Sequence, residues 1–220
     1  MASRTRFFDA LPPETRRHVL AQGVRRRFTR REIIFHEGDS ADSLHVIDRG
    51  HVAVRVTTRR GDSAMLDVLG PGDALGELAV LPPRGSRSAT AIALEDTQTL
   101  LFSADVFTSL RQSHAEAVEL LLAILVERNR ALTSRLLDAL FEPVDTRLVR
   151  RLLQVDAHYG RGRDAPAALP LTQEDVASLA GTTRESANRL LRRLADDGLV
   201  VLGRGSITIP ERELLGRRAL

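Results

Sequence analysis

The sequence contains no cysteine. This absence excludes disulfides, thiolate nucleophiles, cysteine-ligated zinc and cysteine-bound iron–sulfur clusters. Long apolar runs are also missing. The longest, Leu120 to Val126, is far shorter than the ~20 residues needed to cross a bilayer, and no apolar stretch of signal-peptide length follows Met1 to Arg6. We therefore expect a soluble, cytoplasmic protein with no membrane partner.

Signatures of catalysis and of metal binding are missing from the sequence as well. We find no nucleophile–base pair, no Walker-type loop and no HExxH motif, so an enzyme is not expected. The histidines lack the spacing of metal ligands, and we expect neither a metal nor a haem. These histidines are His18, His36, His45, His51, His114 and His158.

Lysine is absent too, and all 32 basic residues are arginine, which we interpret as a codon-usage habit rather than a binding signal. The net charge of +3 is unevenly placed. Residues 1–142 hold 19 arginines and 19 acidic residues, whereas residues 143–220 hold 13 arginines and 10 acidic residues. The excess in the last third indicates nucleic acid as a partner of that part. At 220 residues the chain can form two modest domains or one large one.

The stretch from Gly76 to Ser88 holds the residue types that would bind a sugar and a phosphate together. Gly76 lets the backbone approach a ligand, and the amides that follow it can point at an anion. Glu77 can accept from a ribose hydroxyl, and Arg87 offers a fork of donors to phosphate oxygens. A strand with a charged surface loop is the alternative interpretation, but the full spacing favours a ligand. The predicted site is Gly76, Glu77, Leu78, Ala79, Arg87 and Ser88.

Short β-like runs punctuated by glycine extend from Ile33 to about Phe102. Strands at such short, regular spacing predict an antiparallel barrel or roll. Residues 7–28 look like a short helical segment that begins near Leu11 and Pro12. From Ala104 to Leu140 the apolar period becomes helical, and Phe141-Glu142-Pro143 should end that helix.

The long helix carries an apolar seam over roughly three heptads. A helix packed on its own domain is one interpretation. The narrow stripe, with one polar member and interspersed arginines, favours a dimer helix. The predicted dimer residues are Val118, Leu122, Leu125, Asn129, Leu132 and Leu136.

The last third predicts a helix-turn-helix. A helix with Leu148 and Leu152 and a loop over 159–170 come first. Thr172 then caps one helix, Gly181 supplies a tight turn, and Thr182 or Thr183 caps a second helix.

That second helix should bury its leucines and present a polar face to the DNA major groove. Arginine can bond to guanine O6 and N7, and glutamate can accept from the cytosine amino group. A hairpin around Gly203-Arg204-Gly205 would form a wing. The predicted DNA-binding residues are Thr172, Thr183, Arg184, Glu185, Asn188, Arg189 and Arg204.

Nearly the whole chain resembles the catabolite activator (Crp/Fnr) family of bacterial transcription regulators. Gly76-Glu77-Leu78 with Arg87-Ser88 is similar to the family's phosphate-binding cassette, and Thr183-Arg184-Glu185 with Arg189 is similar to its DNA-reading set. The resemblance implies an α+β fold. Its domains would be a cyclic-nucleotide-binding β-roll over 1–103, a long dimerisation helix and hinge over 104–142, and a winged helix-turn-helix over 143–220.

The resemblance also implies a homodimer that binds one cyclic nucleotide per roll, with cAMP favoured. Binding would reposition the DNA-binding domains on a palindromic operator with TGTGA-like half-sites, and RNA polymerase would be a further partner. An alternative of a different class is a cyclic-nucleotide-binding module that acts through protein contacts only.

One departure concerns the nucleotide base. The family's cAMP-responsive members place a Thr-Ser or Thr-Asn pair on the long helix, where this chain has Leu132-Thr133. Thr133-Ser134 stands one residue later, which rotates each side chain by about 100°. Leu132, Thr133 and Ser134 are therefore all candidates for the base contact. A guanine nucleotide, a cyclic dinucleotide, weakened cAMP affinity, or activity without ligand stay open.

Overall fold

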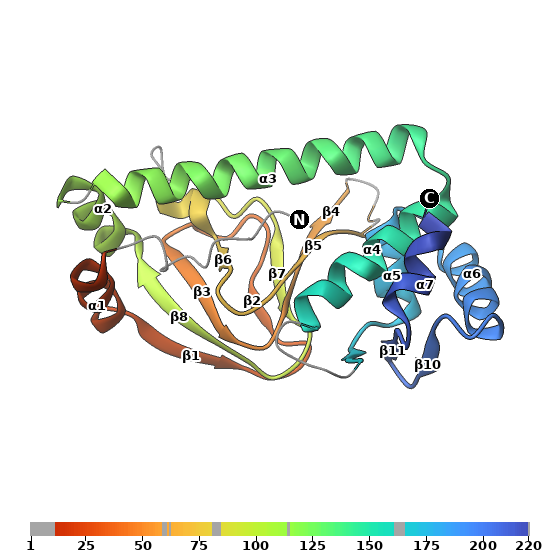
Figure 1. Ribbon diagram of the computed structural model, residues 1–220. Coiled ribbons are helices and arrows are strands. Elements are labelled where there is room, and N and C mark those ends of the chain that lie inside the picture. The colour runs from red at the N-terminus through yellow and green to blue at the C-terminus, as the bar shows by residue number, and fades with distance from the viewer. Residues whose placement is uncertain are drawn as a thin grey trace. The chain divides into compact units, whose positions relative to one another are not determined.

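The computed structural model describes residues 12–58, 61, 63–80, 85–113, 115–160 and 166–219, and of a few of these only the backbone (Figure 1). The fold separates into two compact units. One contains the described residues up to Val56 together with Leu69–Ala131, and the other contains Thr57–Val68 and the residues from Leu132 onward. Among the described residues, no helix is long and apolar enough to cross a membrane.

Two four-stranded sheets form the N-terminal roll. One has the order β1-β8-β3-β6 and the other β2-β7-β4-β5. The strands are β1 (Val24–Phe28), β2 (Ile33–Phe35), β3 (Ser43–Arg49), β4 (Val52–Thr57), β5 (Ser63–Leu69), β6 (Ala74–Leu75), β7 (Thr90–Ala93) and β8 (Thr97–Ser103). Neighbouring strands such as β3 and β8 run antiparallel. The antiparallel roll predicted from the glycine spacing is confirmed.

The core of the roll lies in two apolar clusters. One joins Leu44 and Val46 of β3 to Phe102, Phe107 and Leu121, and the other surrounds Ile47, Val52 and Leu75. The strands supply the second cluster, whereas the first also contains helical residues, Phe107 and Leu121 among them. The roll is thereby a fixed frame for the short 3-10 helix Glu77–Val80 that follows β6.

The helical prediction for residues 7–28 is wrong at its C-terminal end. Helix α1 covers only Pro13–Ala21, with Pro12 as its N-cap, and residues 7–11 lie outside the described part of the chain. Val24–Phe28 is strand β1, which pairs in antiparallel register with Thr97–Leu101 of β8. The backbone bonds to β8 fix these residues as a strand, although their three consecutive arginines show no alternation.

The helical region after the roll contains α2 (Ala104–Ser113) and α3 (Ala115–Phe141), and His114 between them lies outside the described residues. Figure 1 shows α3 as one long helix. It ends where predicted, and Pro143 is the N-cap of α4 (Val144–Tyr159). Proline fits the first turn of a new helix but not the interior of the old one.

In the C-terminal unit, α5 (Gln173–Ala180) packs against both α4 and α6 (Arg184–Asp196). A three-stranded sheet of order β10-β11-β9 follows, and short helices α7 (Arg212–Gly216) and η2 (Arg217–Ala219) end the unit. The strands are β9 (Ala168–Leu169), β10 (Val201–Gly203) and β11 (Ser206–Thr208).

Part of the predicted loop over 159–170 is ordered differently. Residues 161–165 lie outside the described residues, but Ala168–Leu169 is strand β9 and pairs with Ile207 and Thr208 of β11. Leu169 is fully buried, so its apolar side chain holds this end of the loop on the core.

Candidate functional site

The backbone turns sharply at Gly76, between β6 and the 3-10 helix. Its φ of 78° lies in the left-handed region that favours glycine. A Cβ atom at this position would stand 2.3 Å from Nη1 of Arg87 and 3.0 Å from the carbonyl oxygen of Ser43. Gly76 therefore creates the space that the Arg87 guanidinium occupies.

Arg87 is buried in this space, with only 5% of its surface exposed. Nη1 donates to the carbonyl oxygen of Ser43 over 2.7 Å, and Nη2 donates to the Ser43 hydroxyl over 2.9 Å. The guanidinium also lies 4.2 Å from the centre of the Phe35 ring. Its Nε is buried, and among the residues that the structure describes it has no hydrogen-bond partner.

The charge of Arg87 is only weakly compensated. Asp42 is the nearest carboxylate, 3.6 Å from Nη2, and its side chain is 76% exposed. Burial lowers the pKa of Arg87, and Asp42, Asp39 and Glu77 oppose that effect. A buried cation whose direct hydrogen-bond partners are neutral favours the binding of an anion.

Glu77, the first residue of the 3-10 helix, is 3% exposed and is paired with Arg128 of α3. Arg128 Nη1 donates to Oε1 of Glu77 over 2.5 Å, and its Nη2 donates to the carbonyl oxygen of Ala74 over 2.6 Å. The long helix is thus fastened to the residue predicted to bind a ribose. This bond uses one acceptor position of Oε1, and the carboxylate has further acceptor positions on both of its oxygens.

The remaining predicted ligand residues are exposed or lie partly outside the described part of the chain. Leu78 is 46% exposed and Ser88 is exposed, whereas the side chain of Ala79 and residues 81–84 lie outside the described part. Leu132, Thr133 and Ser134 are exposed on α3. Gly76, Glu77 and Arg87 are the predicted residues that the structure brings together.

The helix-turn-helix forms through the predicted caps. The Thr172 hydroxyl accepts from the backbone amide of Asp175, and the Asp175 carboxylate accepts from the backbone amide of Thr172 over 2.7 Å, a capping box that starts α5. Gly181 ends α5 with a φ of 61°, and Thr183 caps α6 by accepting from the amide of Ser186. Of the two threonines considered, Thr183 is the cap.

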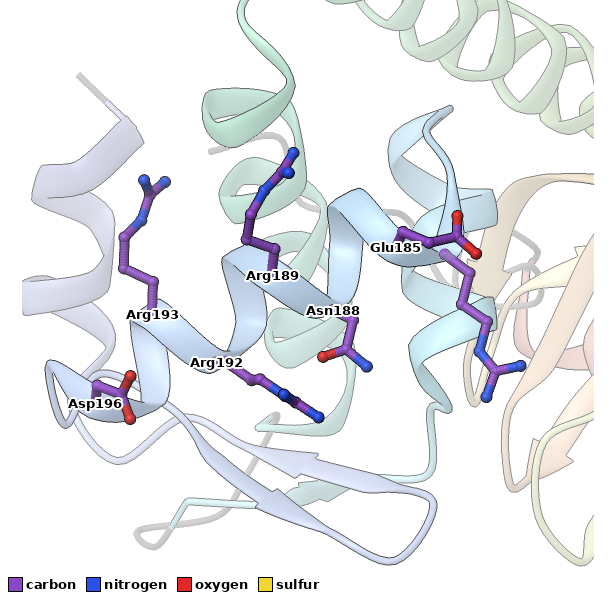
Figure 2. A pocket seen from close by; sticks show the side chains of 7 residues that line it. Glu185, Asn188, Arg189, Arg192, Arg193 and Asp196 are labelled. Atoms are coloured by element: carbon purple, nitrogen blue, oxygen red, sulfur yellow. The ribbon is translucent and has the colours of Figure 1, made fainter.

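Helix α6 separates its apolar and polar sides completely. Ala187, Leu190, Leu191 and Leu194 are buried. A shallow open hollow runs along the opposite side, shown in Figure 2, and its lining residues are Arg184, Glu185, Asn188, Arg189, Arg192, Arg193 and Asp196. Four predicted readers, Arg184, Glu185, Asn188 and Arg189, therefore line this hollow.

Two of the lining residues, Glu185 and Arg193, interact with neighbouring groups of the protein. Hydrogen bonds from its own backbone amide and from Thr183 lower the pKa of Glu185, whose carboxylate is an acceptor when ionised. Arg193 is paired with Asp145 of α4. Glu185 is thus available to a base, whereas Arg193 is held by α4.

The wing forms as predicted from β10 and β11, and Arg204 is exposed at the turn between them. A second hollow lies between the wing and α5; among its lining residues are Thr172, Gln173, Arg184 and Gly203. The Thr172 hydroxyl is engaged in its capping box, so a nucleic acid would meet the start of α5 there rather than a free hydroxyl.

An arginine of α4 connects the turn of this motif to the end of the long helix. Arg147 donates to the carbonyl oxygens of Ala139, Ala180 and Gly181 over 3.1, 3.2 and 3.2 Å. Ala139 lies in the last turn of α3, and the other two precede α6. Arginine satisfies helix C-terminal carbonyls that have no partner within the helix.

The predicted dimer residues form a partly exposed stripe on α3. Leu122, Leu132 and Leu136 are 56%, 51% and 59% exposed. Asn129 is exposed too, whereas Val118 and Leu125 are half-buried. Exposed leucines that gather along one stripe are more typical of an interaction surface than of a helix face in solvent.

Known protein families match both regions in which these sites lie. Residues 25–114 match the model of the cyclic nucleotide-binding domain, and residues 146–218 match the Crp-like helix-turn-helix domain. The CRP-like cAMP-activated global transcriptional regulator of Mycobacterium tuberculosis is 30% identical over 99% of this chain and 97% of its own length. The cyclic AMP receptor protein of Thermus thermophilus is 34% identical, over 95% and 94%.

The chain belongs to the Crp/Fnr family. The crystal structure of Thermus thermophilus catabolite activator protein agrees, with 31% identity, a TM-score of 0.56 and 98% of each chain covered. This member of the Crp/Fnr family is a cyclic-nucleotide-binding transcription regulator, not an enzyme. The predicted family and the α+β fold class, a cyclic-nucleotide-binding β-roll followed by a long helix and a helix-turn-helix, are confirmed.

Three residues of this Crp/Fnr protein were not singled out for their roles from the sequence. Arg128 pairs with Glu77 across 51 positions, Gln173 contacts Asn188 of α6, and Arg147 holds the turn before α6. Each contact is long-range, so no local motif marks it. The sequence did offer a signal for Arg128. It lies four residues before Leu132, a predicted base contact, so both residues share one side of α3.

Proposed function

We propose that this protein is a homodimeric transcription regulator in which a cyclic nucleotide, with cAMP favoured, controls binding to palindromic promoter DNA with TGTGA-like half-sites. The observation that carries the proposal is the presence of two separate buried side chains of opposite charge in the roll, Glu77 and Arg87, beside the left-handed turn at Gly76. A ribose hydroxyl and a phosphate are the two groups that such a pair would hold together.

The residues of the roll fit this ligand chemically. A ribose hydroxyl would donate to Glu77, and the phosphate would accept from Arg87 and Ser88. Ser43 gives Arg87 neutral hydrogen-bond partners. Among the described residues, the carboxylate that pairs with Arg87 is that of Asp42, which is exposed and 3.6 Å away. A phosphate would supply the missing counter-charge. The backbone amides of Leu78 and Ala79 follow the glycine turn. Because Gly76 has no side chain, a phosphate could approach these amides closely.

The base contact belongs to Leu132, Thr133 and Ser134 in this proposal. The Thermus thermophilus and Mycobacterium tuberculosis relatives carry cAMP in their names, and this supports an adenine nucleotide. Leu132 offers no hydrogen bond where a hydroxyl would read a base. cGMP, a cyclic dinucleotide and ligand-independent activity are therefore outcomes that the experiment below must distinguish.

The DNA half of the proposal assigns Arg184, Glu185, Asn188 and Arg189 to base edges. The start of α5 at Thr172, together with Thr183 and Arg204, is assigned to positioning on the DNA backbone. A two-fold dimer through the α3 stripe would present two copies of α6 to two half-sites, so the operator would be a palindrome. Bound DNA would then recruit or obstruct RNA polymerase.

The domain boundaries keep their predicted places in this account, with the roll over 1–103, the dimer helix and hinge over 104–142, and the DNA-binding domain over 143–220. The ligand acts by preferring the DNA-competent dimer, so the coupling is reciprocal between the two sites. A module that works through protein contacts alone would bind the nucleotide but not the palindrome, and the same experiment distinguishes that case.

The test titrates purified protein with cAMP, cGMP and a cyclic dinucleotide by calorimetry and measures affinity for a TGTGA-type palindrome by fluorescence anisotropy. We expect heat with cAMP and tighter DNA binding in its presence. The R87L variant should lose the heat of binding and keep its fold by circular dichroism. Unchanged calorimetric affinity of R87L refutes the assignment of the roll, and a protein that ignores the palindrome in all ligand states refutes the DNA function.

A further inference from the structure

Two side-chain amides join the helices of the helix-turn-helix. Nδ2 of Asn188, on α6, donates to Oε1 of Gln173, on α5, over 2.5 Å. Both residues are half-buried, whereas Arg184, Arg189 and Arg192 of α6 are exposed. Asn188 is thus held by another helix of the motif rather than left in solvent.

The amide pair lies on the same side of α6 as two of its exposed arginines. Asn188 lies four residues after Arg184 and four before Arg192, so the three side chains share one face of α6. Figure 2 shows Asn188 pointing to the same side of α6 as Arg192, whereas Arg189 and Arg193 point to the other side. Asn188 lines the hollow along α6, and Gln173 lines the hollow beside the wing.

The hydrogen bond fixes how the asparagine can meet a base. An amide side chain has two N–H donors on one end and an acceptor oxygen on the other. Gln173 takes one N–H of Asn188, which sets the direction of the amide and leaves its second N–H and Oδ1. This remaining pair of groups matches N7 and the N6 amino group of adenine in the major groove.

We propose that Asn188 reads an A·T base pair in each half-site and that Gln173 is its positioning residue. This inference rests on the proposed DNA function and adds a base preference that the arginines and Glu185 do not supply, since they match guanine and cytosine. Gln173 contributes by holding the amide in its reading direction before DNA arrives, which reduces the entropy lost on binding.

The test measures anisotropy competition with a set of operators in which each base pair of the half-site is replaced in turn. For the wild-type protein, one position should prefer A·T by roughly five- to 150-fold, the range of a bidentate contact. N188A should lose that preference and keep the others. Q173A should lose part of the preference at the same position, and the double variant should lose no more than N188A.

Two further variants distinguish positioning from simple packing. Q173E keeps an acceptor for Asn188 Nδ2, so it should retain the A·T preference while weakening all operators through its charge. E174A, an exposed neighbour on α5, should leave every preference unchanged. A specific wild-type protein whose N188A variant keeps all base preferences overturns this inference alone. So does a Q173A variant that loses affinity equally for all operators. A wild-type protein that discriminates no base pair overturns the DNA function as well.

Discussion

Glu77 and Arg128 form a 2.5 Å ion pair between the ligand loop of the roll and the long helix, and the glutamate is almost fully buried. The same arginine donates to the carbonyl oxygen of Ala74 at the end of β6. Arg128 of α3 therefore contacts both the residue proposed to bind a ribose and the strand before it. A ligand that binds to Glu77 would therefore alter the ion pair between Glu77 and Arg128.

Removing Arg128 should leave a buried, uncompensated carboxylate. We expect R128M to lower the unfolding free energy of the protein by about 3 kcal/mol in urea titrations, as for other broken buried pairs. The E77Q/R128M double variant should recover much of that loss, because its buried amide carries no charge. Equal stability of the two variants would contradict an electrostatic role for the pair.

The exposed leucines of α3 should hold the dimer together. Glutamate at Leu122 and Leu136 would place charges in the stripe, and we expect L122E/L136E to be monomeric by light scattering. L137E is the matched control, since Leu137 is 51% exposed on the same helix but is rotated by about 100° from Leu136. The seam is refuted if the double variant stays dimeric or if L137E dissociates as readily.

His45 should make the roll sensitive to mild acid. Its pKa is lowered from 6.5 to about 4, first by burial and then by Arg87 and Arg26, and its Nδ1 bonds to the Thr99 hydroxyl. The unfolded chain takes up this proton at higher pH than the folded one. The stabilisation is therefore complete above pH 6.5 and is lost as the pH falls towards 4.

This window can be measured with a variant that does not titrate. Between pH 7 and pH 5 the wild-type protein should lose roughly 2 kcal/mol more unfolding free energy than H45Q. Urea unfolding at the two pH values gives both numbers. Equal losses in the two proteins would show that His45 titrates as in the unfolded chain.

Arg147 should hold the start of α6 in its binding orientation. R147M removes the donors from the carbonyl oxygens of Ala139, Ala180 and Gly181, and we expect a loss of about 2 kcal/mol in unfolding free energy with weaker DNA binding. R130M is a suitable control, because Arg130 is exposed on α3 and pairs only with Glu127 among the described residues. DNA affinity in R147M equal to that in R130M would rule out this role.

Local patterns predicted the parts of the structure that local physics determines. Glycine turns marked the roll, Pro143 ended α3, and Thr172 with Asp175 started α5, because each feature is set by residues within one turn. Strand β1 was missed because its partner β8 lies about 70 positions away and its arginines give no alternation.

The site was predictable to the same extent. Glu77 and Arg87 could be named because each is a suitable donor or acceptor in a spaced motif. Their buried surroundings, Ser43 and Arg128, come from β3 and α3, and only the folded chain brings them together. The amide of Gln173 was missed for the same reason, since its contact with Asn188 depends on the crossing of α5 and α6.

The most direct test of the account is reciprocal coupling between the two sites. The dissociation constant of cAMP is measured by calorimetry with and without a saturating TGTGA-type palindrome, and that of the DNA with and without cAMP. We predict that both fall by one common factor, in the range of about five- to 150-fold. Two unchanged dissociation constants would contradict the claim that the nucleotide site in the roll controls DNA binding.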